Sequence, residues 1–227
     1  MNPLDLTDKR VLLTQANDFM GPMLSEVFRE LGATVIADHG PIDDPARPAR
    51  LVSEAGHIDV LLANLGIPAP ATPAADVDED EWRRAFAHMV DPLQRLVKAV
   101  LPQMTERGSG KIILIGSASA LRGIRRASTY SAARGAQLAY IQSVGVEVAA
   151  RNVQVNAIAQ NYVDNPTYFP PEVQANPVFR DKLKREVPLG RLVSAREDAL
   201  FAAYLASAAA DCFVGQIFPV CGGWVPR

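Results

Sequence analysis

Five short, almost continuously apolar segments recur along the chain, with helix-like stretches between them. They cover residues 10–14, 33–37, 58–63, 111–115 and 153–158, and a sixth is expected at 215–220. Strands buried on both faces of a parallel sheet have this composition, because neither face meets water. Helical patterns lie around 20–31, 79–100, 128–150 and 195–208. The alternation predicts an α/β fold with a doubly wound parallel sheet and right-handed crossovers.

The chain is long enough for one large core and is not divided. It has 227 residues, of which 48% are hydrophobic and 21% charged, and it contains no repeat or flexible linker. We therefore expect residues 1–227 to form a single catalytic domain. One long stretch, 160–186, is predicted to be irregular because it holds Pro166, Pro170, Pro171 and Pro177. It follows the fifth predicted strand, where doubly wound sheets bind ligands, and is expected to be a substrate-pocket loop.

The charge pattern excludes several classes of partner. Net charge is -2 and the two signs are interspersed, so neither nucleic acid nor a membrane surface is expected as a partner. No apolar run approaches the roughly 20 residues of a membrane span. The only cysteines, Cys212 and Cys221, follow no signal peptide and are expected to be buried thiols of a cytoplasmic protein. His39, His57 and His88 lack metal-ligand spacing, so no metal site is expected.

The turn after the first predicted strand is unusual for a sheet of this type. Residues 14–21 carry Gln15 and Phe19 where short-chain dehydrogenases, which the chain resembles, have glycines; Gly21 is kept. Those glycines let the backbone approach a dinucleotide pyrophosphate. Because the Phe19 ring would fill that space, we expect no NAD(P) and no other cofactor. Asp38, at the end of the second strand, is then expected to be a polar strand end and not a ribose ligand.

Three residues suggest proton-transfer chemistry. Ser117 follows the fourth strand, Tyr130 comes thirteen residues later, and Arg134 lies one helical turn beyond Tyr130. A short-chain dehydrogenase would have Lys in place of Arg134, where it holds the cofactor ribose. A permanently charged Arg lowers the pKa of a neighbouring Tyr without any nucleotide. Singly, these residues would be a strand-end hydroxyl, a helix aromatic and a surface charge; their joint spacing favours a catalytic group.

With the filled turn, the Ser-Tyr-Arg spacing and the long loop together, the chain resembles the halohydrin dehalogenases, cofactor-free relatives of the short-chain dehydrogenases. The resemblance implies a Rossmann-like fold, a homotetramer whose interface the helices near 83–100 and 128–150 could supply, and reversible conversion of vicinal haloalcohols to epoxides. It implies that small anions such as azide, cyanide or nitrite open epoxides in the reverse direction. Tyr130 would be the base, Arg134 would lower its pKa, and Ser117 would hold the substrate oxygen.

The resemblance also implies a halide pocket where a dehydrogenase binds nicotinamide. Backbone amides of the loop after the fifth strand would hold the anion, as such turns do for other anions. The residues expected to bind substrate or halide are Phe19, Gln160, Asn161, Tyr162, Val163 and Phe169. For Tyr162, Phe169 and the adjacent Tyr168, the alternative role is to anchor the loop in the core.

The chain departs from the family pattern at two positions. Gln160 stands where Pro is frequent in the halide loop, and Leu65 replaces an acidic residue that can neighbour the catalytic Arg. His88 aligns with the Asn of the dehydrogenase tetrad, and a structural histidine is the favoured interpretation. Two other functions stay open. A divergent NAD(P)-dependent oxidoreductase would explain the Ser-Tyr pair, and a catalytically silent interaction protein would explain the two departures.

Overall fold

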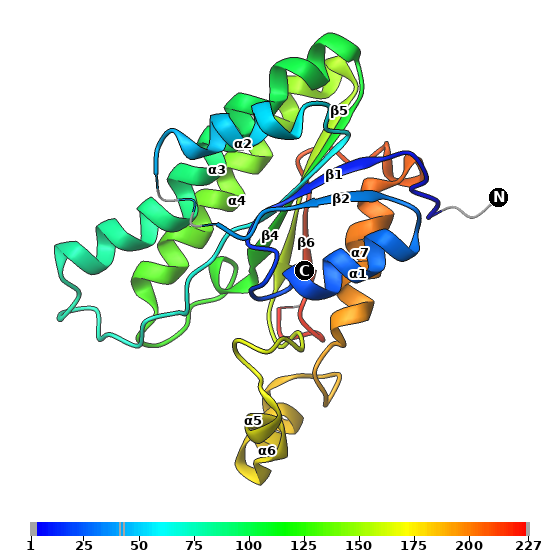
Figure 1. Ribbon diagram of the computed structural model, residues 1–227. Helices are drawn as coiled ribbons and strands as arrows, with labels where there is room; N and C mark the ends of the chain where they lie inside the picture. The colour runs from blue at the N-terminus through cyan, green and yellow to red at the C-terminus, as the bar shows by residue number, and fades with distance from the viewer. Residues whose placement is uncertain (1–3, 41, 43, 226–227) are drawn as a thin grey trace.

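The computed structural model describes residues 4–40, 42 and 44–225, and these form one parallel sheet flanked by helices (Figure 1). The strand order is β2-β1-β3-β4-β5-β6, with every pair parallel. The predicted doubly wound α/β fold is therefore confirmed. The strands are β1 (Arg10–Leu13), β2 (Thr34–Ala37), β3 (Val60–Asn64), β4 (Gly110–Ser117), β5 (Val153–Gln160) and β6 (Ile217–Val220).

Helices cover both faces of this sheet. α1 (Gly21–Glu30) and α7 (Ala195–Ala206) pack on one face, and α2 (Arg47–Ala55), α3 (Glu79–Arg107) and α4 (Ser128–Val148) pack on the other (Figure 1). Side chains of β1 alternate between the two cores: Leu12 joins the core under α2–α4, and Val11 and Leu13 join the core under α1 and α7. Both faces are apolar because both are covered. Short 3₁₀ helices are η1 (Ala118–Ala120), η2 (Ala149–Arg151) and η3 (Ala208–Ala210).

The segment 160–186 differs from the sequence prediction. Its second half is helical, with α5 (Pro171–Ala175) and α6 (Pro177–Glu186) forming a lobe beyond the end of the sheet (Figure 1). Two of the prolines that suggested irregular chain, Pro171 and Pro177, are the first residues of these helices, and Pro170 is the N-cap residue of α5. In the first turn of a helix the backbone N–H groups have no intrahelical acceptor, so proline, which lacks this N–H, loses no hydrogen bond there. Its fixed φ also suits the helix. The prediction of an irregular connection is therefore wrong for 171–186 and holds only for the residues between the end of β5 and the start of α5.

Register brings the ends of three strands together at one edge. In the β4–β5 pair Ser117 lies opposite Gln160, and in the β3–β4 pair Asn64 lies opposite Ile115. The strand order reverses between β1 and β3, which is the position where sheets of this type bind ligands. Ser194 caps α7 at the same edge and forms a capping box with Glu197. This box fixes the start of α7, so that the next residue, Asp198, lies in the first turn of that helix.

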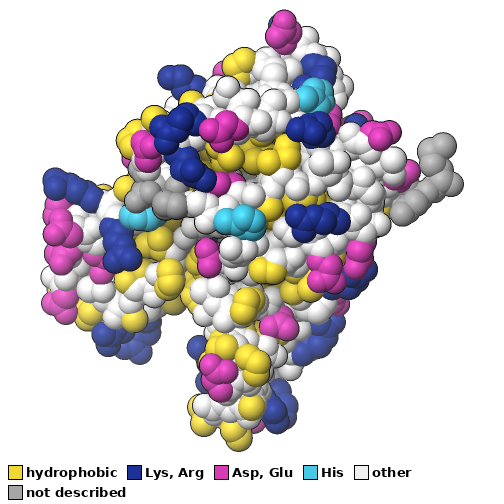
Figure 2. Space-filling view, in the orientation of Figure 1, with side chains coloured by type: hydrophobic (Ala, Val, Ile, Leu, Met, Phe, Trp, Pro, Cys, Tyr) yellow, Lys and Arg dark blue, Asp and Glu magenta, His cyan; other side chains and the backbone are white. Residues whose placement is uncertain are grey.

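The described surface carries mixed charge. Lys and Arg side chains lie among Asp and Glu side chains over the face in Figure 2. None of the described helices has the length and apolarity needed to cross a bilayer. Cys221 is buried as predicted, but Cys212 is exposed. The prediction of two buried thiols is wrong for Cys212 because it lies just after η3, in a turn where the chain reaches the surface.

Candidate active site

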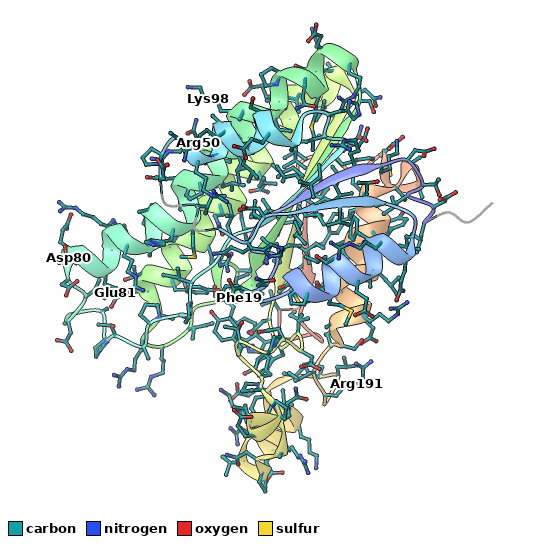
Figure 3. The ribbon with its side chains drawn as sticks, viewed as in Figure 1. Phe19, Arg50, Asp80, Glu81, Lys98 and Arg191 are labelled. Carbon is teal, nitrogen blue, oxygen red and sulfur yellow. The ribbon has the colours of Figure 1, made fainter. Side chains whose placement is uncertain are left out.

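Every residue predicted for the site lines one cavity of about 180 Å³ at the carboxyl edge of the sheet. Figure 3 shows Phe19 there, at the start of α1 and on the side of the α5–α6 lobe. The predicted residues brought together are Phe19, Ser117, Tyr130, Arg134, Gln160, Asn161, Tyr162, Val163 and Phe169. Their catalytic and binding roles remain predictions. The wall also includes residues that were not predicted to bind substrate or halide, namely Asn64, Ala69, Ile115, Gly116, Ser119, Ile124, Ala127, Asn165 and Tyr168.

Tyr130 is buried near the start of α4, in a small apolar cluster with Met89 and Ala133. Burial alone would raise the pKa of its hydroxyl, because a phenolate is poorly solvated there. The charge of Arg134, followed by hydrogen bonds with Tyr168, Arg134 and Ser117, outweighs burial and lowers the pKa of Tyr130 below 10.0. Such a phenol gives up its proton more readily than a free tyrosine, which suits a general base.

Arg134 supplies this charge from a buried position. Its guanidinium carbon lies 5.1 Å from the Tyr130 ring centroid. Nη1 donates to the carbonyl oxygen of Leu65 at 2.8 Å and to that of Ile115 at 3.3 Å. All of its acceptors are neutral, because Leu65 offers a backbone carbonyl where the family pattern has a carboxylate. The positive charge is therefore not neutralised by a carboxylate among these contacts, and its field acts on Tyr130 undiminished.

Gln137, one turn after Arg134, is a positioning residue that sequence analysis missed. It is fully buried, and its Oε1 accepts from Arg134 Nη1 at 3.0 Å. Its Nε2 donates to the carbonyl oxygen of Met89 at 2.7 Å. Gln137 therefore ties the guanidinium to α3. The i, i+3 spacing from Arg134 was a signal for it, but a glutamine in a helix is usually exposed.

Ser117 ends β4 with its hydroxyl toward the cavity. Its Oγ lies 2.9 Å from the Oγ of Ser119 and accepts from the Ser119 N–H at 3.2 Å. These contacts fix the Ser117 side chain on the same wall as Tyr130. A substrate oxygen placed there can hydrogen-bond both hydroxyls, as the sequence analysis expected for Ser117. Ser119 is a further polar residue that sequence reasoning did not select.

Aromatic side chains close the cavity on the loop side. Phe19 packs against Tyr168 with ring centroids 5.7 Å apart, and Tyr162 stacks on Phe169 at 6.1 Å. The Tyr168 hydroxyl donates to the Ile67 carbonyl oxygen and accepts from the Ala69 N–H, both at 3.1 Å. Burial and the neighbouring Tyr130 raise the pKa of Tyr168, so its hydroxyl stays neutral, with one proton that either the Ile67 carbonyl oxygen or Tyr130 can accept.

The hydroxyl of Tyr162 is directed toward the end of α6 and away from the catalytic side chains of the cavity. It donates to Glu186 Oε2 at 3.0 Å. Burial, and then this carboxylate, raise the pKa of Tyr162 to about 12. The ring thus lines the cavity while the hydroxyl ties the loop to the end of α6. Both roles considered for Tyr162, pocket wall and loop anchor, are therefore compatible with its geometry.

The amides expected to hold an anion differ in their availability. Asn161 N–H donates to the Val220 carbonyl oxygen at 3.1 Å, and Tyr162 N–H donates to Asn161 Oδ1 at 2.9 Å. In the part of the chain that the structure describes, no acceptor faces the N–H of Val163. Tyr162 has a φ of 52°, the left-handed conformation that turns successive amides toward one side. An anion would meet Val163 first and would have to share the Tyr162 amide.

The turn that carries Phe19 keeps a glycine-like backbone without the glycines. Gln15 and Phe19 have φ of 46° and 51°, in the left-handed region. The Gln15 side chain accepts from the Gly66 N–H at 2.8 Å and donates to the Gly66 carbonyl oxygen at 3.1 Å. The Phe19 ring lies against the same residue, and its N–H donates to Thr167 Oγ1 at 3.2 Å. These side chains occupy the space above the turn, so the turn does not fit a dinucleotide pyrophosphate.

Asp38 is engaged in contacts of its own. It forms an ion pair with Arg47 of α2, and its Oδ1 also accepts from the Gly40 N–H at 3.4 Å. The side chain is buried, so it is a strand-end anchor and does not present a free carboxylate to a ribose. His88 Nδ1 contacts the Arg84 carbonyl oxygen within α3 at 2.8 Å, a structural role as favoured from the sequence. Among the described residues, no group of three or more His, Cys, Asp or Glu side chains could hold a metal ion.

Gln160 has a partner that the sequence did not suggest. Its Nε2 donates to Asp198 Oδ2 at 2.5 Å, across from the end of β5 to the first turn of α7. Asp198 is fully buried, and burial, opposed by the bond from Gln160, raises its pKa to about 7. Where the family pattern has a Pro, this chain therefore places an amide in contact with a buried carboxyl group.

Comparison with known sequences shows that the chain is similar to dehydrogenases and reductases. A family model described as enoyl-(acyl carrier protein) reductase matches residues 7–225. Cis-4-hydroxycyclohexanecarboxylate dehydrogenase of Sinomonas cyclohexanicum is 36% identical, with 77% of this chain and 69% of that protein covered. A 3-oxoacyl-[acyl-carrier-protein] reductase of Vibrio cholerae is 29% identical, with 97% of this chain and 98% of that protein covered.

Comparison with solved structures also finds dehalogenases. A structure described as a dehalogenation enzyme superposes with a TM-score of 0.91 at 32% identity, covering 97% of this chain and 100% of that chain. A halohydrin dehalogenase bound to ethyl (2S)-oxiran-2-ylacetate gives a TM-score of 0.89 at 27% identity, covering 96% and 99%. The fold is thus shared by both chemistries, and the side chains of the cavity must distinguish between them.

Proposed function

The chain belongs to the short-chain dehydrogenase/reductase superfamily, and from that premise we propose that it is a cofactor-independent halohydrin dehalogenase, a carbon-halide lyase. One observation carries the proposal. The cavity joins a tyrosine of lowered pKa and a buried arginine to a former phosphate turn that Gln15 and Phe19 fill. Under this proposal Tyr130 is the base, and the side chains of Gln15 and Phe19 take the place that a hydride carrier would need.

The cavity supports ring closure in one concerted displacement. The Tyr130 phenolate takes the hydroxyl proton of a vicinal haloalcohol while Ser117 donates a hydrogen bond to the same oxygen. That oxygen then forms a bond to the neighbouring carbon as the carbon–halogen bond breaks, and the electron pair leaves with the halide. Tyr130 keeps the proton until solvent removes it. The reverse direction, with azide, cyanide or nitrite as nucleophile, returns the proton from Tyr130 to the epoxide oxygen.

In this scheme Arg134 lowers the pKa of Tyr130 and so favours its phenolate form. An uncharged residue there would leave the phenolate of Tyr130 buried without compensation, at a cost of several kcal/mol. The leaving halide would move toward Phe19 and the loop Gln160–Val163, an apolar wall with the Val163 amide at its base. Large, polarisable anions fit such a wall better than strongly hydrated ones. The two solved dehalogenases of the same fold support this choice of chemistry.

The test is halide and acid release from a panel of vicinal haloalcohols with no cofactor added, followed with a pH indicator. We expect turnover by the wild type and a loss of at least about 10²-fold in Tyr130→Phe, as for removal of a general base. Tyr140→Phe is the matched control, because Tyr140 lies on the same helix outside the cavity. Equal turnover in Tyr130→Phe and Tyr140→Phe would remove Tyr130 from the mechanism, and no release from any haloalcohol would refute the function.

The second candidate is a divergent NAD(P)-dependent oxidoreductase. The curated relatives and the retained Ser117–Tyr130 pair favour it. It requires that Gln15 release Gly66 and that Phe19 leave the turn. Calorimetric titration with NAD and NADP separates the two proposals, because only the oxidoreductase binds a nucleotide.

We also propose a homotetramer. α3 and α4 pack against each other, and Trp82 on α3 and Val146 on α4 are exposed, at 42% and 72%. The resemblance places the subunit interface on these two helices, and these exposed apolar side chains are candidates for it. Sedimentation velocity should give the mass of four 24.5 kDa chains. A monomer at micromolar concentration would contradict the proposal.

A further inference from the structure

Asp198 is a buried carboxyl group that ring closure does not use. It is 0% exposed, it lies in the first turn of α7, and its Oδ1 has no hydrogen-bond partner among the described residues. Its Oδ2 accepts from Nε2 of Gln160, which lines the cavity. Burial of an ionised carboxyl group with one unpaired oxygen costs free energy, and uptake of a proton lowers that cost. Of the residues described, Gln160 alone joins Asp198 by a hydrogen bond to the proposed site.

Among the described residues, no charged group near α7 stabilises the ionised form of Asp198. α7 packs on α1, β4 and η3 and follows the loop that begins at Asn161, and the ionic groups on these elements have other partners or face solvent. Within the part of the chain that the structure describes, Gln160 is the only side chain that acts on the Asp198 carboxyl. The charged groups in question are Arg196 with Glu26 and Glu30, Arg191 with Glu197, Lys111 with Asp211, Asp164 with Gln174, and the exposed Arg29.

The state of Asp198 decides which end of the Gln160 carboxamide faces the cavity. An ionised carboxylate only accepts hydrogen bonds, so it must meet the amide nitrogen, as observed. Nitrogen and oxygen diverge from the same carbon, so the Gln160 oxygen then points away from Asp198, and no described donor reaches it. A protonated carboxyl can donate to that oxygen instead. A carboxamide that turned over to accept this bond would present its NH₂ group to the cavity.

We propose that Asp198 is a positioning residue for the anion end of the cavity and controls anion binding through Gln160. When Asp198 is ionised, Gln160 presents its carbonyl oxygen, which repels a halide. When Asp198 is protonated, Gln160 presents N–H donors beside the Val163 amide, and the halide binds. The inference rests on the proposed function, since it takes halide as the anion. It adds that anion binding is coupled to proton uptake at a residue outside the catalytic group.

The coupling has an expected size. If bromide binds only when Asp198 is protonated, the apparent Kd is the intrinsic Kd divided by the protonated fraction. With the pKa of Asp198 at about 7, the apparent Kd should rise by about tenfold between pH 6 and pH 8. Asp198→Asn cannot titrate, so its Kd should be the same at both values. Gln160→Met keeps the length of the side chain without its donors and should bind bromide weakly at both values.

The probe is sodium bromide at constant ionic strength, detected by tryptophan fluorescence. Trp224 is 7% exposed and lies edge-on to Tyr162 at 6.2 Å, so an anion in the cavity should quench it. Trp82 is 42% exposed, and Trp82→Phe in every protein removes collisional quenching there. Tyr130 is present in both the wild type and Asp198→Asn, so any effect of its lowered pKa cancels and their difference isolates Asp198.

Each outcome decides the proposal. A pH-dependent Kd in the wild type and constant values in Asp198→Asn and Gln160→Met support it. An equal slope in wild type and Asp198→Asn refutes the role of Asp198 and leaves the halide site standing. A slope that persists in Gln160→Met refutes the role of Gln160, since charge alone would then act. Absence of bromide binding at pH 6 in all the proteins refutes the halide site itself, and with it the proposed function.

Discussion

Replacing Asp198 with Asn should stabilise the protein above neutral pH. The side chain is almost the same in shape, but it carries no proton that folding must hold. In the wild type, burial raises the pKa of Asp198 from 3.8 to about 7, so between these values the folded protein binds a proton that the unfolded chain has released. Proton binding at Asp198 therefore contributes fully to the free energy of unfolding below pH 4. This contribution falls as pH rises and is fully lost above pH 7.

The magnitude follows from the shift. About three pKa units at 1.36 kcal/mol each correspond to about 4 kcal/mol over the whole range. Some two of these units lie between pH 5 and pH 7. The wild type should therefore lose about 3 kcal/mol of unfolding free energy relative to Asp198→Asn between pH 5 and pH 8. Groups that titrate in both proteins cancel in this double difference.

Urea unfolding followed by circular dichroism at pH 5, 6.5 and 8, at one protein concentration, measures the difference. Asp80→Asn is the matched control, because Asp80 is an exposed carboxylate on α3 (Figure 3). We expect its curve to run parallel to that of the wild type. If Asp198→Asn also runs parallel to the wild type, the carboxyl group is hydrated or paired in solution, and burial does not govern its titration.

Three other substitutions or additions test the catalytic group and the filled turn. Arg134→Lys should lower activity and move the rising limb of the pH–rate profile to higher pH, because a smaller charge effect leaves the pKa of Tyr130 higher. An unchanged profile would show that Arg134 does not set the pKa of Tyr130. Phe19→Ala should weaken bromide binding and slow ring closure while leaving the melting temperature within a few degrees, so a large loss of Tm would show that Phe19 is a core residue instead. NAD or NADP at millimolar concentration should leave Tm unchanged, because a ligand of the folded state must raise it, and a saturable rise would favour the oxidoreductase.

The parts of the fold that depend on local pattern could be predicted from the sequence. Parallel strands buried on both faces leave long apolar runs, and their carboxyl ends meet at one edge. Ser117 and Gln160 could therefore be assigned to one site before their register was known. Helix starts at proline were harder, because the same residues signal a break or a first turn. This is why 171–186 was predicted to be irregular.

The residues missed at the site depend on tertiary packing. Gln137 and Asp198 look like exposed polar residues of helices, and only the packing of α4 and α7 buries them. Tyr168 stood beside predicted pocket residues, but its contact with Tyr130 needs the loop to fold back over the sheet. Sequence spacing identifies neighbours on one helix or on adjacent strands. It does not identify contacts across three elements.

The backbone of the turn at Gln15 and Phe19 has a consequence for how such proteins change their chemistry. Both residues hold a conformation that glycine adopts freely and that costs other residues about 1 kcal/mol or more each. Glycine at either position would therefore require no new path for the chain. A turn that accepts a phosphate and a turn filled by side chains therefore differ only in the residues at these two positions, and each can be substituted without a change in the backbone. Under the proposed function, a lineage could therefore fill a phosphate-accepting turn, or an engineer could empty it, by single substitutions on an unchanged backbone path.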